Sequence, residues 1–207
     1  MKLNMKGFYF VTDSGLSKKG NYADVQAALA AGVDFIQYRH KSGTLQEMIE
    51  EGQALRQLCQ GHDCKFLIND RVDVCLAVDA DGVHLGQEDL SYQTARKLLG
   101  PSKIIGLTVH NVEEALAAEE LGADYLGISP IYETKTKPDA GPASGVELIR
   151  AIKKVCKIPV VAIGGIKLYN APAVIDAGAD SLATISAVIT KEDVEAEIRK
   201  FQELFHD

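Results

Sequence analysis

The stretch LGADY, residues 121–125, decides the fold, because close copies of it recur along the chain. AGVDF spans residues 31–35, AGADS spans residues 177–181, and DADGV at residues 79–83 is a looser version. Each copy lies between a segment of helical periodicity and a short apolar run. Glycine can adopt the left-handed conformation that ends a helix, so a short loop then returns the chain to a parallel strand. The repeat therefore predicts successive helix-to-strand returns.

Short apolar runs alternate with amphipathic segments along the whole chain. Strand–helix alternation with apolar strands indicates a parallel sheet covered by helices. Eight such runs favour an α/β fold, a (β/α)8 TIM barrel, which we expect to occupy residues 1–207 as a single domain. An open doubly wound sheet is the alternative, but its usual glycine-rich dinucleotide fingerprint is absent. The eight strand candidates are residues 7–13, 35–40, 65–70, 82–86, 104–109, 125–130, 159–165 and 181–189.

Composition restricts the class of protein and its partners. The chain has 207 residues and a net charge of -7. This charge argues against nucleic acid as a partner, because binding a phosphate backbone needs a basic face, whereas a small phosphorylated ligand needs only a local cluster of cations. No run approaches the ~20 apolar residues that span a bilayer, so we expect no membrane partner and a cytoplasmic location.

The cysteines do not indicate a metal site or a disulfide scaffold. Cys59 and Cys64 bracket His62 in CQGHDC, but this spacing matches no usual zinc pattern and no second ligand pair lies nearby. Four cysteines are too few for a disulfide scaffold in a chain of this length. We therefore expect them to have structural roles.

The second strand carries an unusual set of polar side chains. In a TIM barrel, chemistry lies at the carboxyl ends of the strands. This strand runs into QYRHK, where Gln37, Arg39 and Lys41 alternate and so point to one side. A parallel strand is normally apolar on both faces, so two cations and an amide on one face favour an anion site over a solvated rim.

Oxygen ligands follow the third and fourth strands. Asn69 and Asp70 lie in NDRVD, and Asp89 lies in GVHLGQEDL. Their amide and carboxylate oxygens suit a hard cation. Asp70 and Asp89 are equally suited to cap the helices that follow. We interpret His84, inside the fourth strand, as a packed barrel residue.

Small and hydroxyl residues end the later strands. Thr108 and His110 end the fifth strand, Gly164 and Gly165 end the seventh, and Ser186 lies at the end of the eighth. The loops after strands seven and eight form the usual phosphate site of this fold. The strand ends thus predict two anion sites, which a substrate pair carrying pyrophosphate on one partner and phosphate on the other would fill.

An ordered set of motifs resembles the thiamine phosphate synthase (thiamine-phosphate pyrophosphorylase) family. The motifs are QYRHK, NDRVD, ADGVHLGQEDL, TVH, TKTK, VVAIGG and ISAV, which extend over nearly the whole chain. The resemblance implies a (β/α)8 barrel and a transferase of thiamine biosynthesis that requires Mg²⁺. Its reaction condenses 4-amino-2-methyl-5-(diphosphooxymethyl)pyrimidine with a thiazole phosphate, giving thiamine phosphate and pyrophosphate. The sequence leaves open whether that thiazole carries a carboxylate, and it leaves the oligomeric state open.

The resemblance also implies roles for individual residues. Asp70 and Asp89 would hold Mg²⁺. The pyrimidine pyrophosphate would be bound by Gln37, Arg39, Lys41 and Asn69, with Thr108 where the family usually has Ser and Lys137 where it has a pyrophosphate-binding Lys. The thiazole phosphate would meet Thr134, Thr136, Gly165, Ile185 and Ser186. The residues implied to be catalytic are Arg39, Lys41, Thr108 and Lys137.

The mechanism that the resemblance implies needs no protein nucleophile or general base. Mg²⁺ and the cations Arg39, Lys41 and Lys137 would stabilise the departing pyrophosphate, and the thiazole nitrogen would attack the cationic methylene of the pyrimidine. Tyr38 and His40 depart from the usual family motif, but we expect their side chains to point away from the site.

Two other functions compete with the synthase. A thiazole tautomerase of the same fold has a His near the end of strand six and lacks the metal carboxylates, whereas this chain has Pro130 there and keeps Asp70 and Asp89. A non-catalytic phosphate-binding barrel would have lost some charged strand-end residues, and none is missing. Both comparisons favour the synthase.

The segment ETKTKPDAGPASG, residues 133–145, contains no aliphatic side chain larger than Ala. A connection of this length in a compact domain usually works as a lid or a binding loop. We expect it to follow strand six, to close over pyrophosphate through Lys137, and to end near Ser144 as the N-cap of the next helix.

Overall fold

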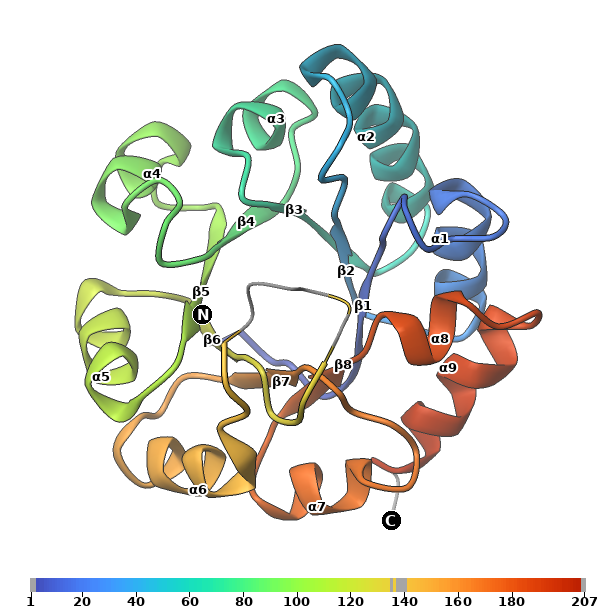
Figure 1. The fold of residues 1–207 in the computed structure, drawn as a ribbon. Coiled ribbons are helices and arrows are strands. Elements are labelled where there is room, and N and C mark those ends of the chain that lie inside the picture. The colour runs from blue at the N-terminus through green and yellow to red at the C-terminus, as the bar shows by residue number, and fades with distance from the viewer. Residues whose placement is uncertain (1–2, 135, 137–140, 206–207) are drawn as a thin grey trace.

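The structure is a computed structural model that describes residues 3–134, 136 and 141–205, and within these residues eight parallel strands form a closed barrel in chain order (Figure 1). The strand that begins the chain, β1, pairs with both β2 and β8, which closes the sheet. The predicted TIM barrel is confirmed. The strands are β1 (Gly7–Val11), β2 (Phe35–Tyr38), β3 (Lys65–Asn69), β4 (Gly82–Leu85), β5 (Ile104–Val109), β6 (Tyr125–Ile128), β7 (Val160–Ile163) and β8 (Ser181–Ala183).

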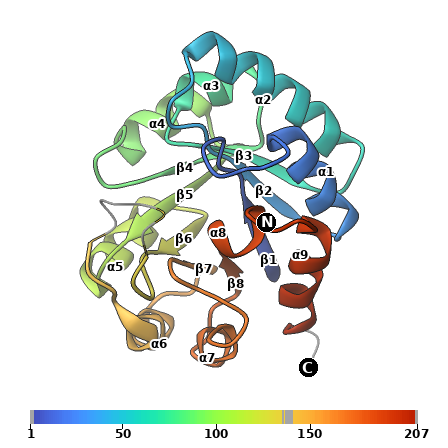
Figure 2. The ribbon, with the colours of Figure 1, turned by 45° about the vertical axis from the view of Figure 1, so that its right-hand side comes forward.

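The helices surround the barrel and cover its outer face (Figures 1 and 2). In the described part of the chain they are α1 (Asn21–Ala30), α2 (Leu45–Gln60), α3 (Val72–Ala77), α4 (Tyr92–Leu99), α5 (Val112–Leu121), α6 (Gly145–Val155), α7 (Ala171–Asp176), α8 (Ser186–Ile189) and α9 (Val194–Glu203). None of these helices combines the length and the apolar composition that crossing a bilayer requires.

The side chains of the strands alternate between two apolar clusters. Outward-facing residues such as Phe10 and Ile36 pack with the helices in one large cluster. Inward-facing residues such as Tyr9, Phe35 and Tyr125 form a separate cluster inside the barrel. This alternation follows from the two-residue period of a strand, and it explains why both faces of each strand are buried.

The aspartates of the recurrent sequence stretch hold neighbouring strands together. Each carboxylate accepts a backbone N–H from the start of the preceding strand and pairs with a cation from an earlier helix. Asp81 accepts the Phe66 N–H at 2.8 Å and contacts Arg56 at 2.9 Å. Asp124 accepts the Ile105 N–H at 2.8 Å and contacts Arg96 at 2.9 Å. Asp180 accepts the Val160 N–H at 2.8 Å and contacts Lys153 at 2.7 Å. The aspartate of the repeat thus stabilises the contact between neighbouring strands, in addition to the role of the glycine in ending the helix.

Asp34 occupies the same place in its copy of the repeat but has no such role. The N–H of Phe8, at the start of β1, donates instead to Oε1 of Gln202 at 2.8 Å, and the amide nitrogen of Gln202 donates to the carbonyl of Gly32 at 3.1 Å. Burial, and then the charge of Asp63, raise the pKa of Asp34. Helix α9 therefore supplies at β1 the acceptor that aspartate supplies elsewhere.

The prediction for the eighth strand is wrong beyond Ala183. Residues 181–189 were expected to form one strand, whereas β8 ends at Ala183 and the chain enters helix α8 at Ser186. Apolar periodicity does not distinguish a buried strand from a short buried helix. The correction places Ser186 at the start of a helix, where it still faces the open end of the barrel.

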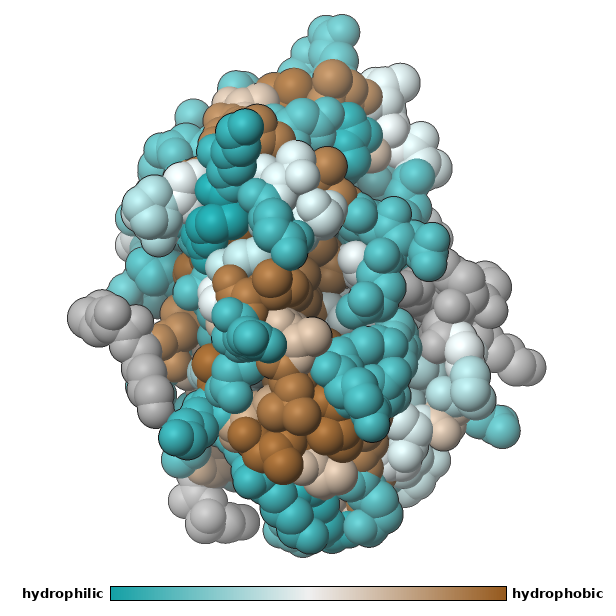
Figure 3. Space-filling view, turned by 90° about the vertical axis from the view of Figure 1, so that its left-hand side faces the viewer, coloured by the Kyte–Doolittle hydropathy of each residue, from teal (hydrophilic) through white to brown (hydrophobic). Residues whose placement is uncertain are grey.

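One side of the molecule carries exposed aliphatic side chains. Leu98 on α4, Leu116 on α5 and Val155 at the end of α6 are each more than 40% exposed. Figure 3, which shows the left-hand side of Figure 1, has an apolar band bordered by hydrophilic side chains.

Replacing Asp124 with Ala should destabilise the barrel by about 1–3 kcal/mol, because the Ile105 N–H and the Arg96 guanidinium lose their shared acceptor. Urea unfolding followed by circular dichroism measures this change. Asp34→Ala is the matched control in the same repeat. It should leave the free energy of unfolding unchanged or raise it, since the carboxylate of Asp34 accepts no hydrogen bond from the described residues and its raised pKa marks an unfavourable charge. Equal losses for the two variants would contradict this role for Asp124.

Candidate active site

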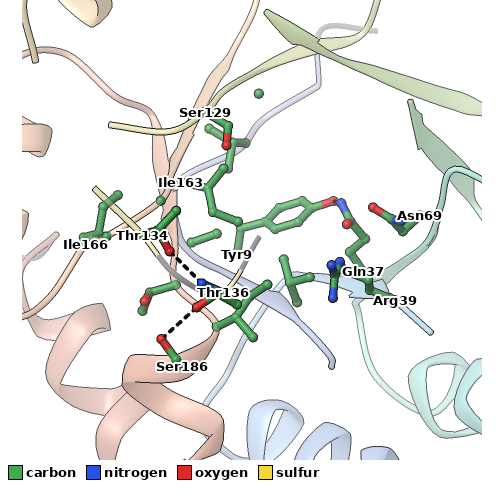
Figure 4. A pocket seen from close by; sticks show the side chains of 18 of the residues that line it. Tyr9, Gln37, Arg39, Asn69, Ser129, Thr134, Thr136, Ile163, Ile166 and Ser186 are labelled. Carbon is green, nitrogen blue, oxygen red and sulfur yellow. Dashed lines mark hydrogen bonds between the residues drawn. The ribbon is translucent and has the colours of Figure 1, made fainter. Parts of the chain in front are cut away.

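A cavity of about 900 Å³ opens at the carboxyl ends of the strands. Its lining includes every described residue for which the sequence predicted a binding, catalytic or metal role: Gln37, Arg39, Lys41, Asn69, Asp70, Asp89, Thr108, Thr134, Thr136, Gly165, Ile185 and Ser186. Lys137 lies outside the described residues. Figure 4 shows Gln37, Arg39 and Asn69 on one side of the cavity and Thr134, Thr136 and Ser186 on the other. The site therefore has a charged half and a hydroxyl half.

Arg39 is held in the charged half by residues that follow β1. Its guanidinium forms a largely buried ion pair with Asp13, and its backbone N–H donates to Oγ1 of Thr12 at 2.9 Å. The other carboxylate oxygen of Asp13 accepts the Gly15 N–H at 3.0 Å. Thr12 and Asp13 were not among the site residues predicted from the sequence, although two polar residues directly after an apolar strand are a signal for a site residue.

Two carboxylates and an ammonium group meet at the ends of β3 and β4. Nζ of Lys41 lies 2.5 Å from Oδ2 of Asp70, and the carboxyl groups of Asp70 and Asp89 lie within hydrogen-bonding reach of each other. Burial alone would raise the pKa of Asp70, but the hydrogen bonds from Lys41 and Asp89 hold it below its usual value. Burial, and then the contact with Asp70, raise the pKa of Asp89.

The alternative roles of these aspartates as helix caps are not observed. Helices α3 and α4 have Arg71 and Ser91 at their N-cap positions. Oδ2 of Asp89 instead accepts the Gly86 N–H at 2.7 Å. Asp70 has φ = 62°, a left-handed conformation that costs a non-glycine residue of order 1–3 kcal/mol. Backbone strain at a cavity-lining carboxylate is typical of a functional position.

The carboxylate pair fits a magnesium ion that shares its coordination with a ligand. Mg²⁺ prefers oxygen ligands and is commonly held by one or two carboxylates, with substrate phosphates and water completing the shell. Among the described residues there is no group of three or more acidic, His or Cys side chains that could form a complete protein cage. Asp70 and Asp89 are two carboxylates of this kind.

The floor of the cavity is a hydrogen-bonded set of side chains inside the barrel. Tyr9 and Tyr125 contact each other through their hydroxyls at 2.9 Å, and Gln37 and His84 extend the set on either side. Burial raises the pKa of Tyr9 to about 12, so this phenol stays protonated at neutral pH. The sequence predicted no role for the two tyrosines and a packing role for His84, because isolated aromatic residues inside apolar strands do not indicate the set that the closed barrel assembles.

Two glycines make room for this floor. A Cβ atom on Gly106 would lie 2.1 Å from the Tyr125 ring, and a Cβ atom on Gly127 would lie 2.7 Å from the His84 ring. Both glycines lie inside strands, where glycine usually marks a close approach of another group. Their absence of side chains lets two large polar residues fit within the barrel.

The hydroxyl half is built where the segment after β6 meets the ends of β7 and β8. The N–H groups of Ile131 and Tyr132 donate to the carbonyls of Ile163 and Gly164 at 3.0 and 2.9 Å, which fixes the start of the segment. Farther along, Oγ1 of Thr136 donates to Oγ of Ser186 at 3.1 Å (Figure 4). Three elements therefore contribute to one polar edge of the cavity.

Gly165 tolerates no side chain at this junction. Its φ is 64°, and a Cβ atom would lie 2.5 Å from the carbonyl oxygen of Glu133. Ser144 takes the expected N-cap position of α6, but its hydroxyl donates to the carbonyl of Pro130 at 3.0 Å and accepts no N–H of the helix. Residues 135 and 137–140 lie outside the described residues, so closure of this segment remains a prediction.

Comparison with known proteins identifies the family. The family described as "Thiamine monophosphate synthase" matches residues 8–188. Similar curated proteins are the thiamine-phosphate synthases of Methanosarcina mazei, 52% identical over 97% of this chain and 83% of that protein, and of Methanosarcina barkeri, 54% identical over 94% and 88%. This chain belongs to the thiamine monophosphate synthase family.

The solved structures agree with membership of the thiamine monophosphate synthase family. Thiamine phosphate pyrophosphorylase from Pyrococcus furiosus is 44% identical to this chain and superposes with a TM-score of 0.89, covering 97% of this chain and 96% of that one. A (S)-3-O-geranylgeranylglyceryl phosphate synthase from Thermoplasma acidophilum, 19% identical with a TM-score of 0.71 and covering 98% and 94%, shares the fold alone. Membership of this family makes the chain a transferase.

Replacing Asp13 with Asn should lower kcat/KM of the family reaction by roughly 10- to 100-fold, because the neutral amide no longer fixes the Arg39 guanidinium and misplacement of a binding group is costly in rate. Steady-state kinetics measure the change. The control is Glu195→Gln, which removes the carboxylate of an exposed ion pair with Arg199 on α9 and should leave kinetics unchanged. An Asp13→Asn protein as active as the control would show that Arg39 does not depend on this partner.

Proposed function

We propose that this chain is a thiamine-phosphate synthase that joins a pyrimidine carrying a pyrophosphate to a thiazole phosphate, releasing pyrophosphate. The observation that carries the proposal is that one cavity has a cationic and carboxylate half opposite a hydroxyl half, in a chain about 50% identical to curated synthases. The two halves match the two anionic groups of such a substrate pair.

The charged half suits the pyrophosphate. Arg39 presents a planar guanidinium already oriented by Asp13, and Lys41 presents a flexible ammonium that is half exposed. Pyrophosphate binding would draw Lys41 from Asp70 toward the substrate oxygens. Both cations then stabilise charge that grows on the leaving group, and Lys137 and Thr108 would add to this.

Mg²⁺ is the cofactor that we propose for the Asp70 and Asp89 pair, where it would supply positive charge to the departing pyrophosphate. The contact between the two carboxyl groups and the raised pKa of Asp89 support the proposal, because two acids this close favour a bound cation over two free negative charges. Asn69, the residue before Asp70, lines the same part of the cavity.

The bond that breaks is the C–O bond between the pyrimidine methylene and pyrophosphate. The bond that forms joins the same carbon to the thiazole nitrogen, whose lone pair attacks without loss of a proton. No general base is therefore needed, and the protein contributes by orienting the two substrates and stabilising the leaving group.

The hydroxyl half suits the thiazole phosphate. Thr134, Thr136 and Ser186 present hydroxyl groups at one edge, and Gly165 and Ile185 bring main chain to the same edge. This arrangement holds a phosphate by hydrogen bonds, while the charged half holds pyrophosphate by ion pairs. The pyrimidine ring would then lie between them, on the floor formed by Tyr9, Tyr125 and His84.

A thiazole tautomerase of the same fold is less well supported. Such an enzyme needs neither the carboxylate pair nor the cations, and its His near the end of strand six is Pro130 in this chain. A non-catalytic barrel would not retain a strained aspartate, an oriented guanidinium and a second cation beside it.

Purified protein supplied with the pyrimidine pyrophosphate, thiazole phosphate and Mg²⁺ should form thiamine phosphate and release one pyrophosphate per product, because the site binds both anions and stabilises the leaving group. Product chromatography and a pyrophosphate assay measure this. Removing Mg²⁺ with a chelator should abolish turnover. Absence of product from a folded sample with authentic substrates would refute the synthase, and isomerisation of a carboxylated thiazole without pyrophosphate release would identify the tautomerase.

A further inference from the structure

The loop between β7 and α7, residues 164–170, is held in place by the side chain of its last residue, Asn170. Nδ2 of Asn170 donates to the carbonyl of Gly165 at 3.2 Å, and Oδ1 accepts the N–H of Lys167 at 2.7 Å. Because a backbone carbonyl only accepts and a backbone N–H only donates, the amide of Asn170 has this one orientation. Residues 164–169 line the cavity, whereas Asn170 is not part of the lining. Asn170 therefore holds the loop from the side away from the cavity.

This use of Asn170 differs from the usual role of its position. Asn170 is the N-cap residue of α7, where an asparagine side chain usually accepts an N–H group of the first helical turn. The side chain makes no such bond, and both of its polar atoms bind the loop instead. Asn170 thus stabilises the loop and leaves the helix uncapped.

Tyr132, in the segment after β6, holds the preceding peptide unit of the loop. Its N–H donates to the carbonyl of Gly164 at 2.9 Å, and its hydroxyl donates to the carbonyl of Asn170 at 3.4 Å. Tyr132 is likewise not part of the cavity lining. Two consecutive carbonyls, those of Gly164 and Gly165, are therefore bound by residues outside the lining.

The N–H groups of the same two peptide units belong to Gly165 and Ile166, and neither has an acceptor in the described part of the chain. Both peptide units are trans, so each N–H points opposite to its carbonyl. Since the carbonyls point to residues outside the lining, the N–H groups point toward the cavity. Gly164 and Gly165 have φ values of 105° and 64°, and successive N–H groups in a turn of this kind form an anion-binding concavity.

We propose that Asn170 is a positioning residue that directs the N–H groups of Gly165 and Ile166 toward the phosphate of the thiazole substrate. The identity of that substrate rests on the proposed function. Figure 4 shows Ile166 on the same side of the cavity as Thr134 and Ser186, so these N–H groups add to the hydroxyl half.

The peptide unit between Gly165 and Ile166 needs such a partner because it follows two glycines. Glycine has no Cβ atom to restrict its backbone, so the unit can rotate when its carbonyl is released. Rotation would replace an N–H donor with a carbonyl oxygen, which repels phosphate. The bond from Asn170 to the Gly165 carbonyl prevents this rotation.

Asn170→Ala removes both side-chain bonds to the loop and keeps the backbone N–H groups themselves. We expect its KM for thiazole phosphate to rise about tenfold, which corresponds to the loss of one hydrogen-bonded contact. Its KM for the pyrimidine pyrophosphate should change less than about twofold, because Arg39 and Gln37 lie on the other side of the cavity (Figure 4). Steady-state kinetics with each substrate varied in turn measure both values.

The matched control is Asn111→Ala at the N-cap of α5, after β5. The side chain of Asn111 also makes two hydrogen bonds, both at 2.8 Å and both with Glu114. Its removal should lower the stability of the protein by a similar amount and leave both KM values unchanged. An unchanged KM for thiazole phosphate in Asn170→Ala, or an equal rise in the control, overturns the proposal.

If Asn170→Ala does not fold, Asn170→Asp takes its place. Aspartate has nearly the same size and keeps an acceptor for the Lys167 N–H, but it cannot donate to the Gly165 carbonyl. Its KM for thiazole phosphate should exceed that of the wild-type protein at high salt as well as at low salt, because salt screens the added charge but not the lost bond. An unchanged KM, or an excess that high salt removes, overturns the proposal.

Amide NMR with inorganic phosphate tests the loop without turnover. The signals of Gly165 and Ile166 in the wild-type protein should shift and reach a plateau as phosphate is added, and Asn170→Ala should need about tenfold more phosphate. Absence of these shifts in the wild-type protein, or equal phosphate dependence in the variant, overturns the proposal. A wild-type protein that shows the shifts but forms no product from either substrate pair contradicts the proposed function instead.

Discussion

The carboxylates of Asp81, Asp124 and Asp180 tie the starts of β4, β6 and β8 to the strands before them, and the rest of the structure depends on the closed barrel that they help to form. Closure brings residues far apart in sequence into one narrow interior. Tyr9 and Tyr125, separated by 116 positions, share a hydrogen bond there. The same closure gathers the carboxyl ends of all eight strands around one cavity, so the polar groups at those ends act on a common ligand.

The charges of the site are already paired before a ligand is bound. Arg39 contacts Asp13, and Lys41 contacts Asp70. The first pair is buried and fixed by further hydrogen bonds, so it orients a cation that stays in place. The second is more exposed and shares its carboxylate with Asp89, so it suits an exchange in which a metal takes the carboxylates and pyrophosphate takes the ammonium. The Asp13 pair thus holds Arg39 ready to contact the ligand, and the Asp70 pair would separate to bind the metal and the pyrophosphate.

The sequence predicted the barrel and the polar strand-end residues of the cavity because both depend on local patterns. Alternating Gln37, Arg39 and Lys41 have one orientation on any strand, and polar residues at strand ends collect at one rim of any parallel barrel. It did not predict Asp13 as the partner of Arg39, nor the hydrogen bond between Tyr125 and His84, because these contacts depend on which strands become neighbours across the interior. The error at residues 181–189 has a local cause, since an apolar run of that length fits a strand or a short helix equally well.

We propose that the charged half of the cavity binds pyrophosphate together with a divalent metal. This is tested by a crystal structure of the protein with pyrophosphate and Mn²⁺ in place of Mg²⁺, with anomalous scattering measured for the metal. We expect an anomalous peak bonded to the carboxylates of Asp70 and Asp89 and to pyrophosphate oxygens, with Arg39 and Lys41 on the same pyrophosphate. Pyrophosphate bound at the hydroxyl half, or a metal that touches neither aspartate, would contradict it.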